Sequence, residues 1–181
     1  MRRTALAALA LLALAAPAHG APAPQVTDPA GDANFTGTGV PTAPASYATL
    51  DITSVRWWAD AGAQHASLAL ADSDRAAPAK YVLRVAPPSC ATTTLAWQPE
   101  WDVALLTGCK PRHQRRYAPP RWSGDTLTFT LPRSGLPSWL APGTTVHGLG
   151  ATTAPVQEYV VGQLHPPVDD ASGETRYVVG S

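Results

Sequence analysis

Apolar and polar residues alternate along much of the chain with a period of two. The clearest case is 125–131, where Leu127, Phe129 and Leu131 fall on one face and threonines fall on the other. This is the pattern of a half-buried β-strand. The same alternation recurs at 64–71 and 80–85. We expect further strands at 51–58, 91–97, 103–106, 145–151, 156–161 and 176–179.

Turn-forming residues separate these segments, and no amphipathic helix alternates with them. Typical separators are Pro87-Pro88 and Pro142-Gly143. About nine short strands joined by short turns predict an all-β fold, an antiparallel β-sandwich of the jelly-roll or immunoglobulin-like kind with one disulfide. We expect a helical turn within 134–140 and loops at 33–48 and 163–173.

The first twenty residues have the pattern of a secretory signal peptide. Arg2 and Arg3 precede an apolar run over 5–16, and small residues follow it. That run is too short to span a bilayer core of about 30 Å, so we expect no membrane anchor. The sequence therefore predicts a signal peptide over 1–20, a single β-sandwich domain over 21–181, and secretion to the extracellular space.

Two cysteines, Cys90 and Cys109, occur in the whole chain. Exported proteins form disulfides, so we expect these two to pair. The closed loop would contribute about 3 kcal/mol in the chain-entropy model. It would also hold a segment containing Trp97 and Trp101 against the sheet.

The charge balance argues against nucleic-acid binding. The chain has 13 basic and 13 acidic residues, and removal of Arg2 and Arg3 would leave 11 basic ones and a net charge near −2. One basic cluster stands out, and we interpret it as a solvated irregular loop, with phosphate or acidic-glycan contact as the less favoured alternative. Its members are Lys110, Arg112, His113, Arg115 and Arg116, with Arg121 just beyond.

The most specific motif is acidic and lies near the N-terminus, in the run 28–34. Its side chains offer oxygen atoms, and a further carboxylate stands at the head of the 51–58 strand. Oxygen atoms of this kind are the ligands that calcium prefers. The candidate ligands are Asp28, Asp32, Asn34 and Asp51, and Gly31 would permit a tight bend. An ordinary turn, in which the carboxylates accept backbone N–H bonds, is the alternative.

At these residues the sequence resembles secreted β-sandwiches of the family 9 carbohydrate-binding and DOMON-like type. The shared features are Asp-Pro-x-Gly-Asp from Asp28 to Asp32 and the strand start Asp51-Ile52. The resemblance implies a structural calcium ion bound by Asp28, Asp32 and Asp51. Related modules continue into Gly-Tyr-x-Tyr-Pro, where this chain has 34–37 as Asn-Phe-Thr-Gly, and no such motif marks the C-terminal half.

Six tryptophans raise the question of carbohydrate binding, because sugar rings stack on exposed indoles. Trp57 and Trp58 are adjacent on an expected strand and must point to opposite faces. The candidate platform consists of Trp97, Trp101 and Trp122, on or beside the disulfide loop. Core packing is the alternative role for the same side chains.

We interpret the chain as a non-enzymatic binding module that contacts a glycan or a cell-envelope component, with no catalytic residues assigned and no oligomeric state implied. The alternative is a secreted enzyme acting on polysaccharide. One form would be a copper oxygenase with an N-terminal His19 and a second histidine, His65, His113, His147 or His165. Another would be a hydrolase with a carboxylate pair, for which no two acidic residues are selected among Asp72, Asp74, Glu100, Asp102, Glu158, Asp169 and Asp170.

Overall fold

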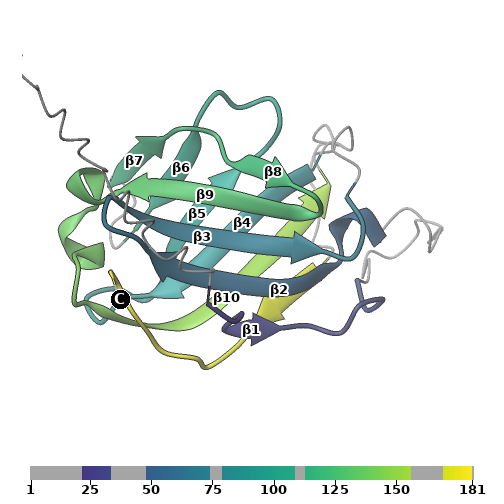
Figure 1. The fold of residues 1–181 in the computed structure, drawn as a ribbon, viewed down its shortest axis with the longest axis horizontal. Helices are drawn as coiled ribbons and strands as arrows, with labels where there is room; N and C mark the ends of the chain where they lie inside the picture. Colours follow the sequence, from purple (N-terminus) through teal and green to yellow (C-terminus); the bar gives the residue numbers. More distant parts are fainter. Residues whose placement is uncertain (1–21, 34–47, 74–78, 109–112, 156–168, 181) are drawn as a thin grey trace, which may run out of the picture.

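Two antiparallel β-sheets packed face to face make up the protein (Figure 1). The computed structural model describes residues 22–33, 48–73, 79–108, 113–155 and 169–180. Within these residues, no helix is both long and apolar enough to cross a membrane. The all-β, two-sheet prediction from the alternating pattern is confirmed.

The five-stranded sheet has the order β1-β2-β3-β9-β8. Its edge strands, β1 and β8, are shorter than the three strands between them. The strands are β1 Val26–Thr27, β2 Ile52–Ala59, β3 Ala63–Leu70, β8 Arg121–Ser123 and β9 Thr126–Pro132.

The seven-stranded sheet has the order β11-β10-β4-β5-β6-β7, and β12 pairs separately with β10. The long strand β10 pairs with β4 through a register shift at 147–150, next to Gly148, whose φ of 54° suits a glycine. The strands are β4 Ala79–Ala86, β5 Thr93–Trp97, β6 Ala104–Thr107, β7 Gln114–Tyr117, β10 Thr145–Pro155, β11 Asp169–Ser172 and β12 Tyr177–Val178.

The core lies between the sheets and contains the apolar rows that the alternation predicted. Leu68 and Phe129 of one sheet and Leu83 and Leu95 of the other are all 0% exposed. On β2, Trp57 is buried at 2% exposure, whereas its neighbour Trp58 is half-buried. The prediction that these two indoles occupy opposite faces is confirmed.

Eight of the nine expected strands are present, and 156–161 lies outside the described residues. Two 3₁₀ turns, at Arg133–Gly135 and Ser138–Leu140, occupy the expected helical region. The interpretation of 163–173 as a loop was wrong for Asp169–Ser172, which form β11. The interpretation of the basic cluster as a loop was wrong for Arg115 and Arg116, which belong to β7. Both strands lie at an edge of the seven-stranded sheet. An edge strand pairs with only one neighbour, so it tolerates a polar sequence.

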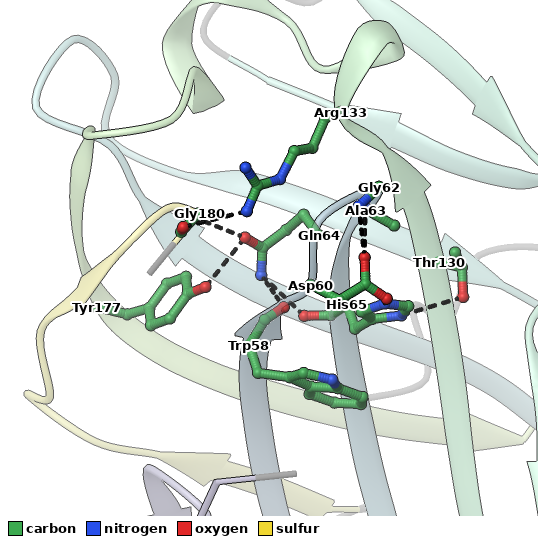
Figure 2. A network of polar contacts seen from close by, with 10 residues as sticks. All are labelled: Trp58, Asp60, Gly62, Ala63, Gln64, His65, Thr130, Arg133, Tyr177 and Gly180. Carbon is green, nitrogen blue, oxygen red and sulfur yellow. Dashed lines mark hydrogen bonds and ion pairs between the residues drawn. The ribbon is translucent and has the colours of Figure 1, made fainter. Parts of the chain in front are cut away.

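A buried polar network joins β3 to the C-terminal segment (Figure 2). Gln64 is 1% exposed, and its Nε2 donates to the carbonyl oxygens of Trp58 at 2.7 Å and His65 at 3.0 Å. Its Oε1 accepts from the Tyr177 hydroxyl at 3.0 Å and the Gly180 N–H at 3.1 Å. All of the hydrogen-bonding capacity of this amide is therefore used, as a buried polar group requires.

We predict that Gln64→Leu lowers the free energy of unfolding by about 2 kcal/mol or more, because it leaves several buried groups unpaired. Tyr177→Phe removes one hydrogen bond and should cost about 1 kcal/mol. Urea unfolding of both variants and of the double variant measures this. Because the two side chains bond each other, the loss in the double variant should differ from the sum of the two single losses. A loss equal to that sum would contradict this coupling.

Candidate metal centre

Three acidic residues from distant parts of the chain meet at one edge of the sandwich. Asp28 directly follows β1, Asp32 lies four residues further along the same connection, and Asp169 begins β11. One carboxylate oxygen from each lies within 4.8 Å of the other two. In the described part of the chain, this is the one group of three acidic, histidine or cysteine side chains placed this closely.

A fourth carboxylate, that of Asp51, adjoins this group. Asp51 precedes β2 and is 1% exposed. Its Oδ2 accepts a short hydrogen bond from the N–H of Gly31. Gly31 has φ of 95°, a left-handed conformation that favours glycine, so the turn between Asp28 and Asp32 is folded toward Asp51. The glycine thus has the role that the sequence motif predicted.

Asp169 connects the two sheets at the same place. Its Oδ2 accepts from the N–H of Ile52 on β2 at 2.6 Å, and its Oδ1 accepts from the N–H of Asp170 at 2.8 Å. Strand β11 belongs to the seven-stranded sheet and β2 to the five-stranded one. Asp169 is therefore held rigidly, with 7% of its surface exposed.

Two oxygens of this cluster are buried and accept no hydrogen bond from the described residues. They are Oδ2 of Asp28 and Oδ1 of Asp51. A buried carboxylate oxygen that accepts no hydrogen bond is costly, and such groups in native proteins commonly indicate a missing ion or water. These two atoms make the cluster a candidate cation site.

Burial, and after it the neighbouring negative charge, raises the pKa of two of the carboxyl groups. The pKa of Asp28 rises from 3.8 to about 6, first because of burial and then because of the charges of Asp169, Asp32, Asp51 and Asp170. Burial also raises the pKa of Asp169, against the lowering effect of its two backbone hydrogen bonds. A bound cation would remove the repulsion that disfavours the charged forms.

The donor set suits a hard divalent cation. Ligand oxygens of calcium lie 2.3–2.6 Å from the ion, so two of them can be up to about 5 Å apart. The spacing of at most 4.8 Å among the oxygens of Asp28, Asp32 and Asp169 agrees with this limit. The residues present therefore fit a calcium ion, with backbone carbonyls or water completing the shell.

The predicted ligand set is placed as follows. Asp28, Asp32 and Asp51 are brought together, while Asn34 lies outside the described residues. Sequence reasoning missed Asp169 as a ligand, because it falls in a segment interpreted as a loop and lacks apolar alternation. The Asp169-Asp170 pair was its only signal, and an acidic pair is equally common on a solvated surface.

The candidate platform tryptophans lie in or against the core. Trp97 is 8% exposed, and its indole N–H donates to the carbonyl of Trp101 at 3.0 Å. Trp101 and Trp122 are half-buried, and Trp122 packs edge-on against Tyr81 with ring centroids 5.7 Å apart. Carbohydrate binding by these indoles stays a prediction, with little open ring surface on Trp97.

In the described residues, no histidine joins a group of potential metal ligands, and of the acidic hydrolase candidates only Asp169 belongs to a carboxylate group, the one described above. His65 hydrogen-bonds Asp60 at 2.9 Å, His113 stacks on Trp139 with ring centroids 5.6 Å apart, and neither belongs to a group of potential metal ligands. His19 and His165 lie outside the described residues. Among the acidic candidates, Asp170 forms a two-pronged ion pair with Arg84 at 2.5 and 2.7 Å.

The fold and this acidic centre define the class of the protein as an all-β sandwich with a carboxylate cluster at one sheet edge. No family model matches the chain, and neither a curated protein nor a solved structure does. The resemblance to family 9 carbohydrate-binding and DOMON-like modules stays a prediction.

We predict that the metal-free protein loses stability as the pH rises from about 4 to about 6. The pKa of Asp28 is about 6 in the folded chain and about 4 in an unfolded one, so in this interval the folded state holds the extra proton. Thermal melts of cation-free protein across this range measure the effect. Asp28→Asn should flatten the decline, and equal slopes for the variant and the wild type would contradict it.

Proposed function

We propose that the chain is a secreted, non-enzymatic binding module whose sandwich is stabilised by one calcium ion. The proposed ligands are Asp28, Asp32, Asp51 and Asp169. The observation that carries the proposal is the convergence of these four carboxylates with two buried, unpaired oxygens among them. Protonation neutralises Asp28 only below about pH 6, so near neutral pH a cation is the remaining way to balance its charge.

Calcium suits this centre better than magnesium does. Calcium accepts six to eight oxygens in irregular geometry, whereas magnesium demands a small octahedral shell and usually keeps several waters. Four carboxylates from three separate segments supply many oxygens at imposed positions. Such a site matches the larger and more tolerant ion.

The role of the ion would be structural. Asp28 follows β1 and Asp51 precedes β2, both strands of the five-stranded sheet. Asp169 is the first residue of β11 in the other sheet. One ion bound to all of them would fasten the N-terminal connection to both sheets. Its binding free energy would then add to the free energy of unfolding.

Secretion and the disulfide belong to the same proposal. The apolar N-terminal segment supports export, and export favours pairing of Cys90 with Cys109. The local packing supports the pairing too, because Cys90 Sγ lies 3.5 Å from Thr93 Oγ1. A Cβ added to Gly108 would lie 2.8 Å from that same hydroxyl, so the chain just before Cys109 passes close to Cys90.

We predict that calcium raises the melting temperature of the cation-free wild type. At a calcium concentration of 100 times Kd the added stability is about 2.7 kcal/mol, which corresponds to roughly 5–10 °C for a domain of this size. Differential scanning calorimetry with and without calcium measures the shift. A melt that calcium leaves unchanged would remove the metal centre from the proposal.

Asp32→Ala is the sharpest variant for this test. Asp32 is exposed, so its loss should leave the fold intact while the calcium-dependent shift shrinks to a small fraction of the wild-type value. Asp102→Ala removes an exposed carboxylate outside the cluster and should keep the full shift. Equal shifts for the two variants would exclude Asp32 as a ligand.

We further predict that the denatured, unreduced protein has no thiol that reacts with an alkylating reagent. Reduction should lower the free energy of unfolding by about 3 kcal/mol, because it reopens the loop. The double variant Cys90→Ser, Cys109→Ser should match the reduced wild type and no longer respond to reductant. Two reactive thiols in the secreted product would disprove the pairing.

A further inference from the structure

A groove of about 570 Å³ lies on the side of the sandwich away from the acidic cluster's strands, where the edge strands β7 and β8 approach β9. Its walls include Arg116 and Tyr117 of β7, Pro119 of the β7–β8 connection, Arg121 of β8, and Thr128 and Thr130 of β9. Both sheets thus contribute to one hollow. Its volume falls within the range of small-ligand sites.

The charge that the described residues bring to the groove is positive. Arg116 and Arg121 are both exposed, and none of the described residues that line the groove carries a carboxylate. Among the described residues, no hydrogen bond or ion pair engages either guanidinium, whereas Arg84 on the seven-stranded sheet is paired with Asp170. In a chain with equal numbers of basic and acidic residues, two unpaired arginines in one hollow favour an anionic occupant.

Polar groups beside the arginines can give a ligand its orientation. Thr128 is the cross-strand partner of Arg121, and β8 pairs with β9 no further than this residue. Backbone groups of alternate residues in an antiparallel strand point to the same side, so the N–H and C=O of Thr130 face this open edge. The Thr130 hydroxyl already contacts Nδ1 of His65 at 3.3 Å. The groove therefore offers the Thr128 hydroxyl and backbone donors and acceptors next to the two cations.

The remaining wall is apolar and firmly held. The Tyr117 side chain is 8% exposed, and its hydroxyl donates to the carbonyl of Gly135 at 2.8 Å. Pro119 and Pro120 fix the backbone of the connection that follows. A rigid wall limits the ordering cost when a ligand binds.

We propose that this groove binds an acidic saccharide, a sugar residue carrying a carboxylate or a sulfate. Arginine binds both groups through paired N–H donors, and Thr128 and the open backbone edge suit sugar hydroxyls. An acidic peptide adding as a strand is less well matched, because the open edge of β9 beyond Thr128 is only four residues long. The inference rests on the binding role proposed above and is independent of the cation.

Isothermal titration calorimetry of the full secreted chain tests this, with calcium held constant in every arm. The probes are trigalacturonic acid, a sulfated trisaccharide and the neutral maltotriose. We expect saturable binding of at least one acidic probe, weakened by added salt, and none of maltotriose. Preference for the carboxylated or the sulfated probe identifies the source of the anionic group.

Arg116→Gln and Arg121→Gln should each weaken binding roughly tenfold, because each removes a charge-assisted hydrogen bond. Arg115→Gln is the matched control, since Arg115 is the neighbouring residue on β7 and does not line the groove. It should change the affinity less than about twofold. Equal losses in all three variants would show a diffuse charge effect and overturn the assignment.

Failure of this inference can be told apart from failure of the proposed function. If neither acidic saccharide binds while calcium still raises the melting temperature, the groove assignment falls and the metal centre stands. Binding of an aspartate-rich peptide in place of the saccharides would also overturn the ligand class. If calcium does not change the melting temperature while an acidic saccharide still binds, the metal centre falls and the groove assignment stands.

Discussion

The structure depends on the burial of carboxylates from both sheets at one edge of the sandwich. Asp51 and Asp169 are almost fully enclosed, at 1% and 7% exposure, and Asp28 lies beside them. Like charges held this closely in a poorly solvated place repel one another and favour protonation. Without a counter-charge this edge would work against folding near neutral pH, so its geometry makes sense when a cation completes it.

A second polar connection between the sheets needs no such completion. Gln64 of β3 binds Tyr177 and Gly180, which lie in and after β12. The amide is neutral and carries both donors and acceptors, so it pairs fully within the protein (Figure 2). The carboxylates carry only acceptors, and two of their oxygens stay unpaired among the described residues. The first connection is therefore complete within the protein, whereas the second leaves acceptors that the proposed ion would satisfy.

Both candidate sites are built by edge strands. The acidic cluster uses β1 and β11, and the basic groove uses β7 and β8, which together are the four outer edges of the two sheets. Central strands are occupied on both sides by neighbours and on one face by the core. Edge strands have unpaired backbone groups and room for charged side chains, so binding residues can be placed there without disturbing the core packing.

The sequence by itself determined the central strands, because burial of one face imposes a period of two that reads directly from residues such as Leu127, Phe129 and Leu131. It also predicted three carboxylates of the acidic cluster, because Asp28 and Asp32 frame a glycine turn and Asp51 stands at the head of the next expected strand.

Only the tertiary structure decided the rest. The four edge strands have only two to four residues each, which is too short for a sustained apolar alternation. Asp169 joins the cluster across more than a hundred residues through the register of β11 with β10. Arg116 and Arg121 share a groove because two sheet edges meet there. Contacts between distant segments follow from how the sheets pack, and a local sequence pattern does not predict that packing.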